Sequence, residues 1–132
     1  MNIEYLDTLP EIENKYQVEL EDGEKVVFTA KLSTFGTETD SRLGAESYFT
    51  LTNKSIIADN GVGTWTVDIV EDVVSCCEER SSLVFFRFPY IYLALNTEIV
   101  FDGGKGKLTG FHFYFNKKDR ATFLNIMNTV LN

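Results

Sequence analysis

The sequence Gly110-Phe-His-Phe-Tyr-Phe-Asn116, followed by Lys117–Asn132, decides the fold of this chain. In its first half, phenylalanines occupy every second position, which is the repeat of a β-strand with one buried face: Phe111, Phe113 and Phe115. After Asn116 the apolar residues recur at intervals of three and four, which is typical of one face of an amphipathic helix: Phe123, Leu124, Met127, Val130 and Leu131. The change of period predicts a strand that runs into a helix.

Asn116 is a suitable N-cap for this helix, with Asp119 in the first turn. We therefore predict a C-terminal helix over residues 117–131. Its apolar face must pack against something else, and the rest of the chain shows the pattern of strands. The helix is therefore expected to cap one end of a β-sheet.

Size and composition favour one globular domain. The chain has 132 residues, 44% of them hydrophobic, and only two prolines. Its N-terminus has no basic region followed by an apolar run, and its longest apolar stretch, Leu83–Leu95, is shorter than the ~20 residues of a spanning helix. We therefore expect a soluble, cytoplasmic protein.

The net charge of −8 is unevenly distributed. Residues 1–24 contain eight acidic residues and one lysine, a net charge of −7, so we assign residues 1–14 to an acidic N-terminal arm and residues 15–132 to a single domain. The last thirty residues carry a net charge of +4, from Lys105, Lys107, Lys117, Lys118 and Arg120 against one aspartate. A nucleic-acid interface needs a denser basic face, so no nucleic-acid partner is expected.

The cysteines and the histidine do not suggest a metal site. Cys76 and Cys77 are adjacent, and neighbours on a strand point to opposite faces, so they are poorly placed for a disulfide or for one shared ion. His112 is the only histidine. We expect no metal and no cofactor.

Alternating apolar residues predict a first hairpin. Residues 15–21 and 24–32 both alternate, and Asp22-Gly23 between them favours a two-residue turn. Upstream of this hairpin, Pro10 fits either the start of a short helix or an extended arm. Downstream, residues 33–47 are small and polar, and we predict a long exposed loop.

Three short strands are predicted next, over residues 47–52, 55–59 and 64–70, as an antiparallel meander. The segments Tyr48–Asp59, with its Leu51-Thr-Asn-Lys54 motif, and Trp65–Ile69 resemble the signature of GRAM and bacterial pleckstrin-homology-like (PH-like) domains. The opening strand of that family is similar to Glu24–Leu32, and its closing strand and helix are similar to Phe111–Leu131. The resemblance implies a PH-like barrel of about seven antiparallel strands, mainly β, capped by one C-terminal α-helix.

The segment that follows is apolar on two faces. After a strand at Val73–Cys77 and a turn at Ser81-Ser82, residues 83–95 place Val84, Phe86, Phe88, Tyr90 and Tyr92 on one face and Phe85, Ile91 and Leu93 on the other. Pro89 indicates a bend or a sheet edge, and an apolar edge needs a cover, which is either the N-terminal arm or a second subunit. A short strand at Ile99–Phe101 and a turn at residues 102–107 complete the sheet.

No catalytic constellation is recognised. The glycines around Lys105 lack the spacing of a phosphate-binding loop and do not precede a helix, so a hairpin turn is predicted there. His112 is predicted to face outward from its strand, without a nucleophile at a recognisable position. The carboxylates Glu71-Asp72 and Glu78-Glu79 are predicted to be solvated strand ends, and no enzyme is expected.

Two binding functions remain. The resemblance implies protein or peptide binding, and the aromatic residues Phe86, Phe88, Tyr90 and Tyr92 suggest self-association as a homodimer. The alternative is peripheral binding of anionic lipid or phosphoinositide. Its family motif has matches at Lys31 and Arg42, but acidic residues crowd that loop, so the basic patch Lys105, Lys107, Lys117, Lys118 and Arg120 is the alternative anion-binding site.

Overall fold

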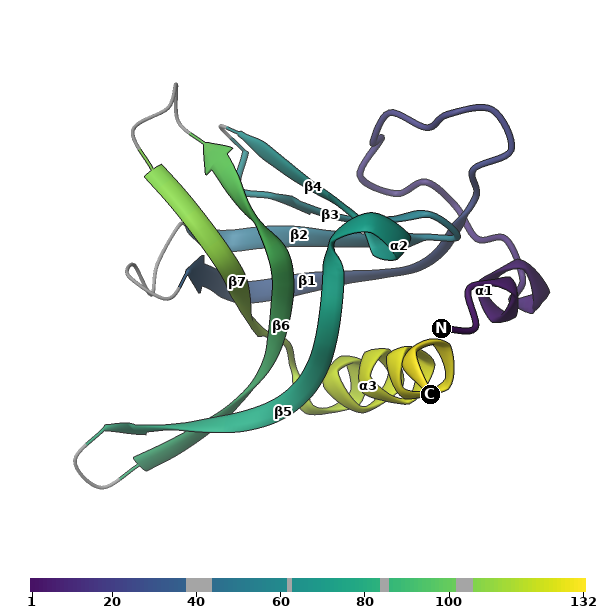
Figure 1. The fold of residues 1–132 in the computed structure, drawn as a ribbon. Helices are drawn as coiled ribbons and strands as arrows, with labels where there is room; N and C mark the ends of the chain where they lie inside the picture. Colours follow the sequence, from purple (N-terminus) through teal and green to yellow (C-terminus); the bar gives the residue numbers. More distant parts are fainter. Residues whose placement is uncertain (38–43, 62, 84–85, 102–105) are drawn as a thin grey trace.

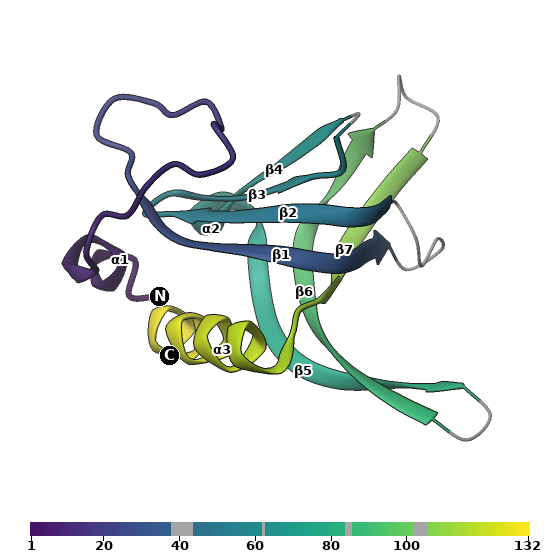
Figure 2. The ribbon, with the colours of Figure 1, turned by 180° about the vertical axis from the view of Figure 1, so that it is seen from behind.

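The computed structural model describes residues 1–37, 44–61, 63–83, 86–101 and 106–132. These residues form seven strands and three helices: α1 Glu4–Thr8, β1 Val26–Thr37, β2 Gly44–Thr52, β3 Ser55–Asp59, β4 Thr64–Asp68, α2 Ile69–Asp72, β5 Val73–Leu83, β6 Phe86–Phe101, β7 Gly106–Tyr114 and α3 Lys117–Leu131. The strands make one antiparallel sheet in the order β4-β3-β2-β1-β7-β6-β5. Figures 1 and 2 show that this sheet bends, so that β1–β4 face β5–β7, with α3 across one open end. The predicted antiparallel sheet with a capping helix is confirmed.

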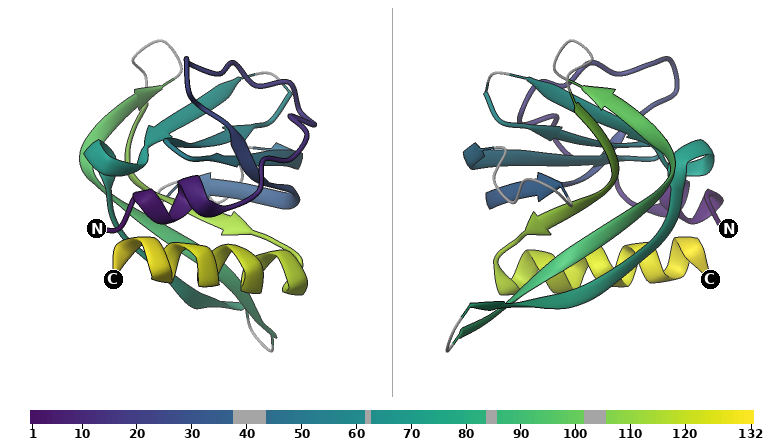
Figure 3. Two further views of the ribbon diagram at one scale, coloured as in Figure 1. Left: turned by 90° about the vertical axis from the view of Figure 1, so that its right-hand side faces the viewer. Right: turned by 60° about the vertical axis from the view of Figure 1, so that its left-hand side comes forward.

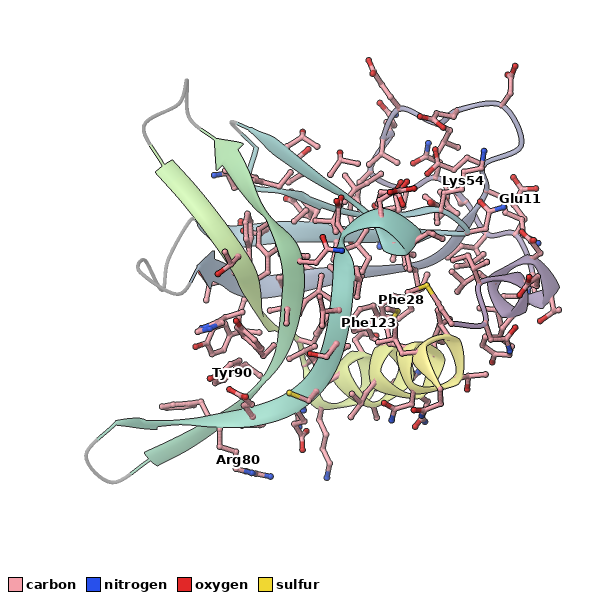
Figure 4. The ribbon with its side chains drawn as sticks, viewed as in Figure 1. Glu11, Phe28, Lys54, Arg80, Tyr90 and Phe123 are labelled. Atoms are coloured by element: carbon pink, nitrogen blue, oxygen red, sulfur yellow. The ribbon has the colours of Figure 1, made fainter. Side chains whose placement is uncertain are left out.

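Aromatic residues fill the space inside the bend. Phe49 of β2 is fully buried, and its ring centroid lies 5.1 Å from that of Phe113 and 4.9 Å from those of Phe115 and Phe123. Phe28 packs against Phe123, 6.1 Å between centroids, in the region between the sheet and α3 (Figure 4). The alternate phenylalanines of β7 therefore meet the helix face in one core, as the change of period predicted.

The start of α3 is also as predicted. The side chain of Asn116 accepts a hydrogen bond from the Asp119 backbone N–H at 2.8 Å. The buried residues of the helix lie three and four apart: Phe123, Ile126, Met127 and Val130. The helix therefore covers the opening with a single apolar face.

The N-terminal residues lie beside α3. Leu6 of α1 is fully buried in the common core, and the Asn2 N–H donates to the carbonyl of Val130. The helix ends at Thr8, so Pro10 does not begin it. Residues 1–9 thus pack near the C-terminus (Figure 1), so the first of the two alternatives for covering the 83–95 strand, the N-terminal arm, is wrong.

Asn53 connects the N-terminal residues to the sheet through three hydrogen bonds of its side chain. Its side chain donates to the Asp7 carboxylate at 2.8 Å and to the Gly23 carbonyl at 3.1 Å, and it accepts from the Lys25 N–H at 2.9 Å. Asn53 is only 9% exposed, so these bonds satisfy a buried amide. The asparagine of the family-like motif ties the N-terminal segments to the turn between β2 and β3.

The predicted first hairpin is wrong. The turn at Gly23 forms, with φ +79°, but residues 15–21 make no strand. Residues 10–25 form instead a strap over the outer face of β1–β4. The ring centroid of Tyr16 in this strap lies 4.7 Å from that of Tyr48 on β2. The side chain of Asn14 donates a hydrogen bond to the Val18 carbonyl and accepts one from the Val18 N–H. The alternating side chains of this segment therefore meet the sheet by packing on its face, without adding a strand.

The predicted loop over residues 33–47 is mostly strand. β1 continues to Thr37 and β2 begins at Gly44, and residues 38–43 lie outside the described part. Thr34 pairs with Ala45 on one side and with Tyr114 on the other. Because strands flank this stretch on both sides, pairing overrides the weak strand preference of its small polar residues.

Two further boundaries differ from the predictions. Ser81 and Ser82 belong to β5, paired with Phe88 and Arg87, so the turn predicted there is wrong. β6 runs without interruption through the predicted short strand at residues 99–101, with a register shift between Ala94 and Ile99. The predicted meander of residues 47–70 is confirmed, although its last strand ends at Asp68 and the short helix α2 follows.

Candidate functional site

The outer surface of β6 and β7 carries a row of aromatic side chains that we call the aromatic face: Phe88, Tyr90, Tyr92, His112 and Tyr114. Ile91 and Leu93 of β6 and Phe113 of β7 are fully buried and point inward. Since side chains alternate along a strand, their neighbours point outward. Three of the four predicted binding aromatics therefore share a face with two residues of β7.

The members of the aromatic face contact one another. The His112 ring lies 4.7 Å from Tyr90 and 5.3 Å from Tyr92, between centroids, and Tyr114 lies 5.3 Å from Tyr90. Cross-strand pairing places Tyr92 opposite His112. His112 is half-buried between two tyrosines, so the outward direction predicted for it is confirmed, but it is part of a packed surface.

Gly110 makes room for Tyr92. A Cβ atom at Gly110 would lie 2.6 Å from the Tyr92 hydroxyl oxygen and 2.8 Å from the ring carbon that carries it. The ring of Tyr92 therefore lies across the glycine backbone, and any side chain at residue 110 would displace it. In the sequence, a glycine inside the last strand is the signal for this contact.

Tyr90 is held by a carboxylate. Its hydroxyl donates to Oε2 of Glu79, which is its cross-strand partner on β5, at 2.9 Å. Burial, together with this hydrogen bond, raises the pKa of Tyr90 to about 12. Tyr90 is 8% exposed and stays a neutral donor at physiological pH, whereas Phe88 on the same strand is 47% exposed.

Phe88 lies on a two-stranded projection that we call the hairpin arm, residues 78–83 of β5 and 86–90 of β6 (Figure 1). The pairing of β6 with β7 begins only at Ile91, opposite Phe113. In the described ranges, residues 86–90 therefore pair with β5 alone, and β5 is the last strand of the sheet. Pro89, predicted to mark a bend or a sheet edge, lies on this stretch.

The remaining predicted aromatic is only partly described. The backbone of Phe86 begins β6, opposite Leu83, and its side chain lies outside the described part of the structure. Figure 4 shows Tyr90 at the base of the hairpin arm and Arg80 further out. The candidate surface therefore runs from the tyrosine and histidine cluster onto the arm.

A comparison of the whole backbone with solved structures now identifies the architecture. The Vps36 N-terminal PH domain matches with a TM-score of 0.61, over 96% of this chain and 95% of that chain. The chain has a PH-like fold. Sequence identity to that domain is 17%, so the likeness concerns the fold alone. No protein-family model matches the sequence, and no curated protein matches it.

The acidic pairs of this PH-like domain are separated. Glu78 accepts from Arg120 Nε at 2.9 Å, while Glu79 accepts from Tyr90 on the aromatic face. Asp72 accepts the backbone N–H of Asp68 in the turn before β5. Within the described ranges, no three His, Cys, Asp or Glu side chains are grouped closely enough to hold a metal ion.

The two cysteines lie on opposite faces of β5, as predicted. Cys76 is buried, which raises the pKa of its thiol to about 12. Cys77 is exposed, and partial burial together with the neighbouring Glu79 raises the pKa of its thiol. A raised pKa lowers the thiolate fraction, so neither side chain is an activated nucleophile.

The structure describes the side chains of three of the five residues in the predicted basic patch. Lys117 and Lys118 are exposed at the start of α3, whereas Arg120 is half-buried and paired with Glu78. Lys105 lies outside the described residues, as does the side chain of Lys107. At the position that the resemblance implied for an anionic headgroup, Lys31 pairs with Glu46 at 3.8 Å, and Arg42 lies outside the described residues.

None of the helices in the described ranges combines the length and the apolar character needed to cross a bilayer.

Proposed function

We propose that this PH-like domain is a non-catalytic protein-binding module and that the aromatic face with the hairpin arm is its docking surface. PH-like folds commonly mediate protein or lipid binding. The observation that carries the proposal is Phe88, an exposed apolar side chain on a projecting hairpin next to a packed row of tyrosines and a histidine. Aromatic residues with a polar group are enriched at protein interfaces.

The partner that fits this surface best is a second copy of the chain. The hairpin arm contains Glu78, Glu79, Arg80 and Arg87, which sum to zero charge, whereas the whole chain carries −8. Because residues 1–24 carry −7 of this charge, repulsion between two copies is strongest around those residues and weak at the arm. The arm also offers strand edges to which an antiparallel copy can add, in an isologous dimer.

The test is light scattering coupled to gel filtration over a range of protein concentrations. We expect a concentration-dependent dimer for the parent chain and a monomer for Phe88→Glu. Val70→Glu is the matched control, because Val70 is 54% exposed on α2 and lies outside the aromatic face. A parent chain that stays monomeric, or a Phe88→Glu variant that still dimerises, contradicts self-association.

Peripheral binding of anionic lipid is the alternative, and Lys117 and Lys118 support it. A lysine near an anionic membrane contributes about 1 kcal/mol, so two of them bind weakly on a chain of this net charge. Flotation with vesicles with and without phosphatidylserine distinguishes the two functions. Salt-sensitive flotation that Lys117→Glu abolishes would favour lipid. GRAM-type membership and a cytoplasmic location stay predictions.

A further inference from the structure

The strap, residues 10–25, covers part of the half of the sheet that is remote from the aromatic face. Ile57 of β3 is 4% exposed, although its neighbours Ile56 and Ala58 are the ones that point into the core. Ile57 is buried on the outer side because Tyr16 and Val18 of the strap lie beside it. Figure 3 shows the strap crossing in front of the strands.

A groove of about 430 Å³ opens between the strap and the strands β3 and β4. Its lining combines strap residues with outward residues of the two strands: Tyr16, Gln17, Val18, Glu19, Ile57, Asp59, Thr64 and Thr66. Strand pairing places Asp59 opposite Thr64 and Ile57 opposite Thr66, so these four form two neighbouring rows. The volume is sufficient for one long side chain of a partner.

The polar groups of the groove suit a cation. Glu19 and Asp59 line the groove from the strap and from β3, and the described residues of the lining include no lysine or arginine. Lys15 lies next to it in the strap, with its Nζ 5.7 Å from the centroid of the Tyr16 ring. Oδ1 of Asp59 accepts the Gly61 N–H at 2.6 Å, which fixes the orientation of that carboxylate. In the part of the chain that the structure describes, the side chains of Glu19, Thr64 and Thr66 make no hydrogen bond or ion pair with another residue.

The negative charge of the N-terminal segment strengthens the preference of the groove for a cation. Residues 1–24, which include the strap, carry a net charge of −7. A negative field of this size attracts basic segments and repels acidic ones. The apolar part of the lining, Val18, Ile57 and the ring of Tyr16, matches the methylene groups of a long basic side chain.

We infer that this groove binds an arginine side chain from a basic segment of a partner protein. The guanidinium has five N–H donors in a plane, which suits a groove that offers two carboxylates and two threonine hydroxyls. This site is independent of the proposed dimer, because it lies on β3 and β4 and the aromatic face lies on β6 and β7.

The experiment is an NMR titration of the intact chain with N-acetyl-arginine amide. The neutral isostere N-acetyl-citrulline amide is the matched ligand. We expect saturable shifts of the Glu19, Thr64 and Thr66 amides with the arginine probe and none with citrulline. Equal shifts with both probes, shifts spread over the whole surface, or no shift would overturn the inference.

Two variants, each of which removes one carboxylate charge from the groove, test where the arginine probe binds. Asp59→Asn keeps an oxygen for the Gly61 N–H, and Glu19→Gln keeps the length of the side chain. Each is expected to weaken binding of the arginine probe about fivefold, the upper range for an exposed ion pair. Glu71→Gln removes the same charge from exposed α2 and is the control, expected to bind as the parent does. Parent-like binding by both groove variants would also overturn the inference.

Discussion

The two faces of β7 are both aromatic, yet they do different things. Phe111, Phe113 and Phe115, on β7 and just after it, point inward and are at most 6% exposed, whereas His112 and Tyr114 point outward and are half-buried. The inner rings contact the core on every side, from β1, β2 and α3. The outer rings of His112 and Tyr114 contact the tyrosine rings of β6, on the side open to solvent.

This difference separates stability from binding. A ring that is buried on every side stabilises the folded state, because its removal leaves a cavity and lowers the free energy of unfolding. A ring that keeps one side in water, and that carries a polar group, remains available for a partner. We expect substitutions on the inner face to unfold the protein and substitutions on the outer face to alter contacts while the fold persists.

The largest effect should come from Phe49→Ala on the inner side. Phe49 is fully buried and packs against Phe113, Phe115 and Phe123, so the free energy of unfolding should fall by about 4 kcal/mol. Urea denaturation followed by circular dichroism measures it. Phe49→Leu, which retains much of the volume, is the control. A fall of less than about 2 kcal/mol for the alanine variant would show that the cavity collapses.

An intermediate effect is expected at the base of the aromatic face. Tyr90→Phe removes the hydrogen bond to Glu79 and keeps the ring, so the free energy of unfolding should fall by about 1 kcal/mol. Urea denaturation at neutral pH measures this change. An unchanged denaturation midpoint would mean that water replaces the bond without cost.

The same residue predicts a dependence on pH. The pKa of Tyr90 is raised to about 12 in the folded chain, from 10.0, so the unfolded chain loses this proton first. The stabilisation is therefore complete below about pH 10 and is lost as the pH rises towards 12. Burial also raises the pKa of Tyr16, so a phenolate absorbance titration should show a late-titrating component that is smaller by one tyrosine in Tyr90→Phe. An unchanged titration in that variant would contradict the assignment.

The smallest effect on stability should come from Phe88→Ser on the hairpin arm. Phe88 is 47% exposed, and the free energy of unfolding should change by no more than about 0.5 kcal/mol. Denaturation at low protein concentration measures the monomer and avoids a contribution from association. A loss close to that of Phe49→Ala would remove the distinction between the two faces.

Local patterns of apolar residues in the sequence sufficed to predict much of the fold. The period of two before Asn116 and the period of three and four after it predicted β7 and α3, because both elements bury one face against the same core. The meander was likewise evident from short alternating runs and turns. The errors at residues 15–21 and 33–47 came from segments whose state depends on distant partners, Tyr48 for the strap and β7 for the end of β1.

The candidate site could be predicted from the sequence only in part. Alternation placed Phe86, Phe88, Tyr90 and Tyr92 on one face of a strand, but it did not distinguish exposed Phe88 from Tyr90, which Glu79 and Tyr114 cover. The groove below the strap could not be predicted, because Glu19 and Asp59 lie forty residues apart in the sequence.

The sequence by itself determined which side of the meander strands, of β7 and of α3 is apolar, since that choice depends on neighbours two to four residues away. Only the tertiary structure decided which outward residues become neighbours: His112 between two tyrosines of β6, Asn53 against Asp7, and the strap over β3. The physical reason is that these contacts depend on the bend and register of the sheet, which arise from the packing of the whole core.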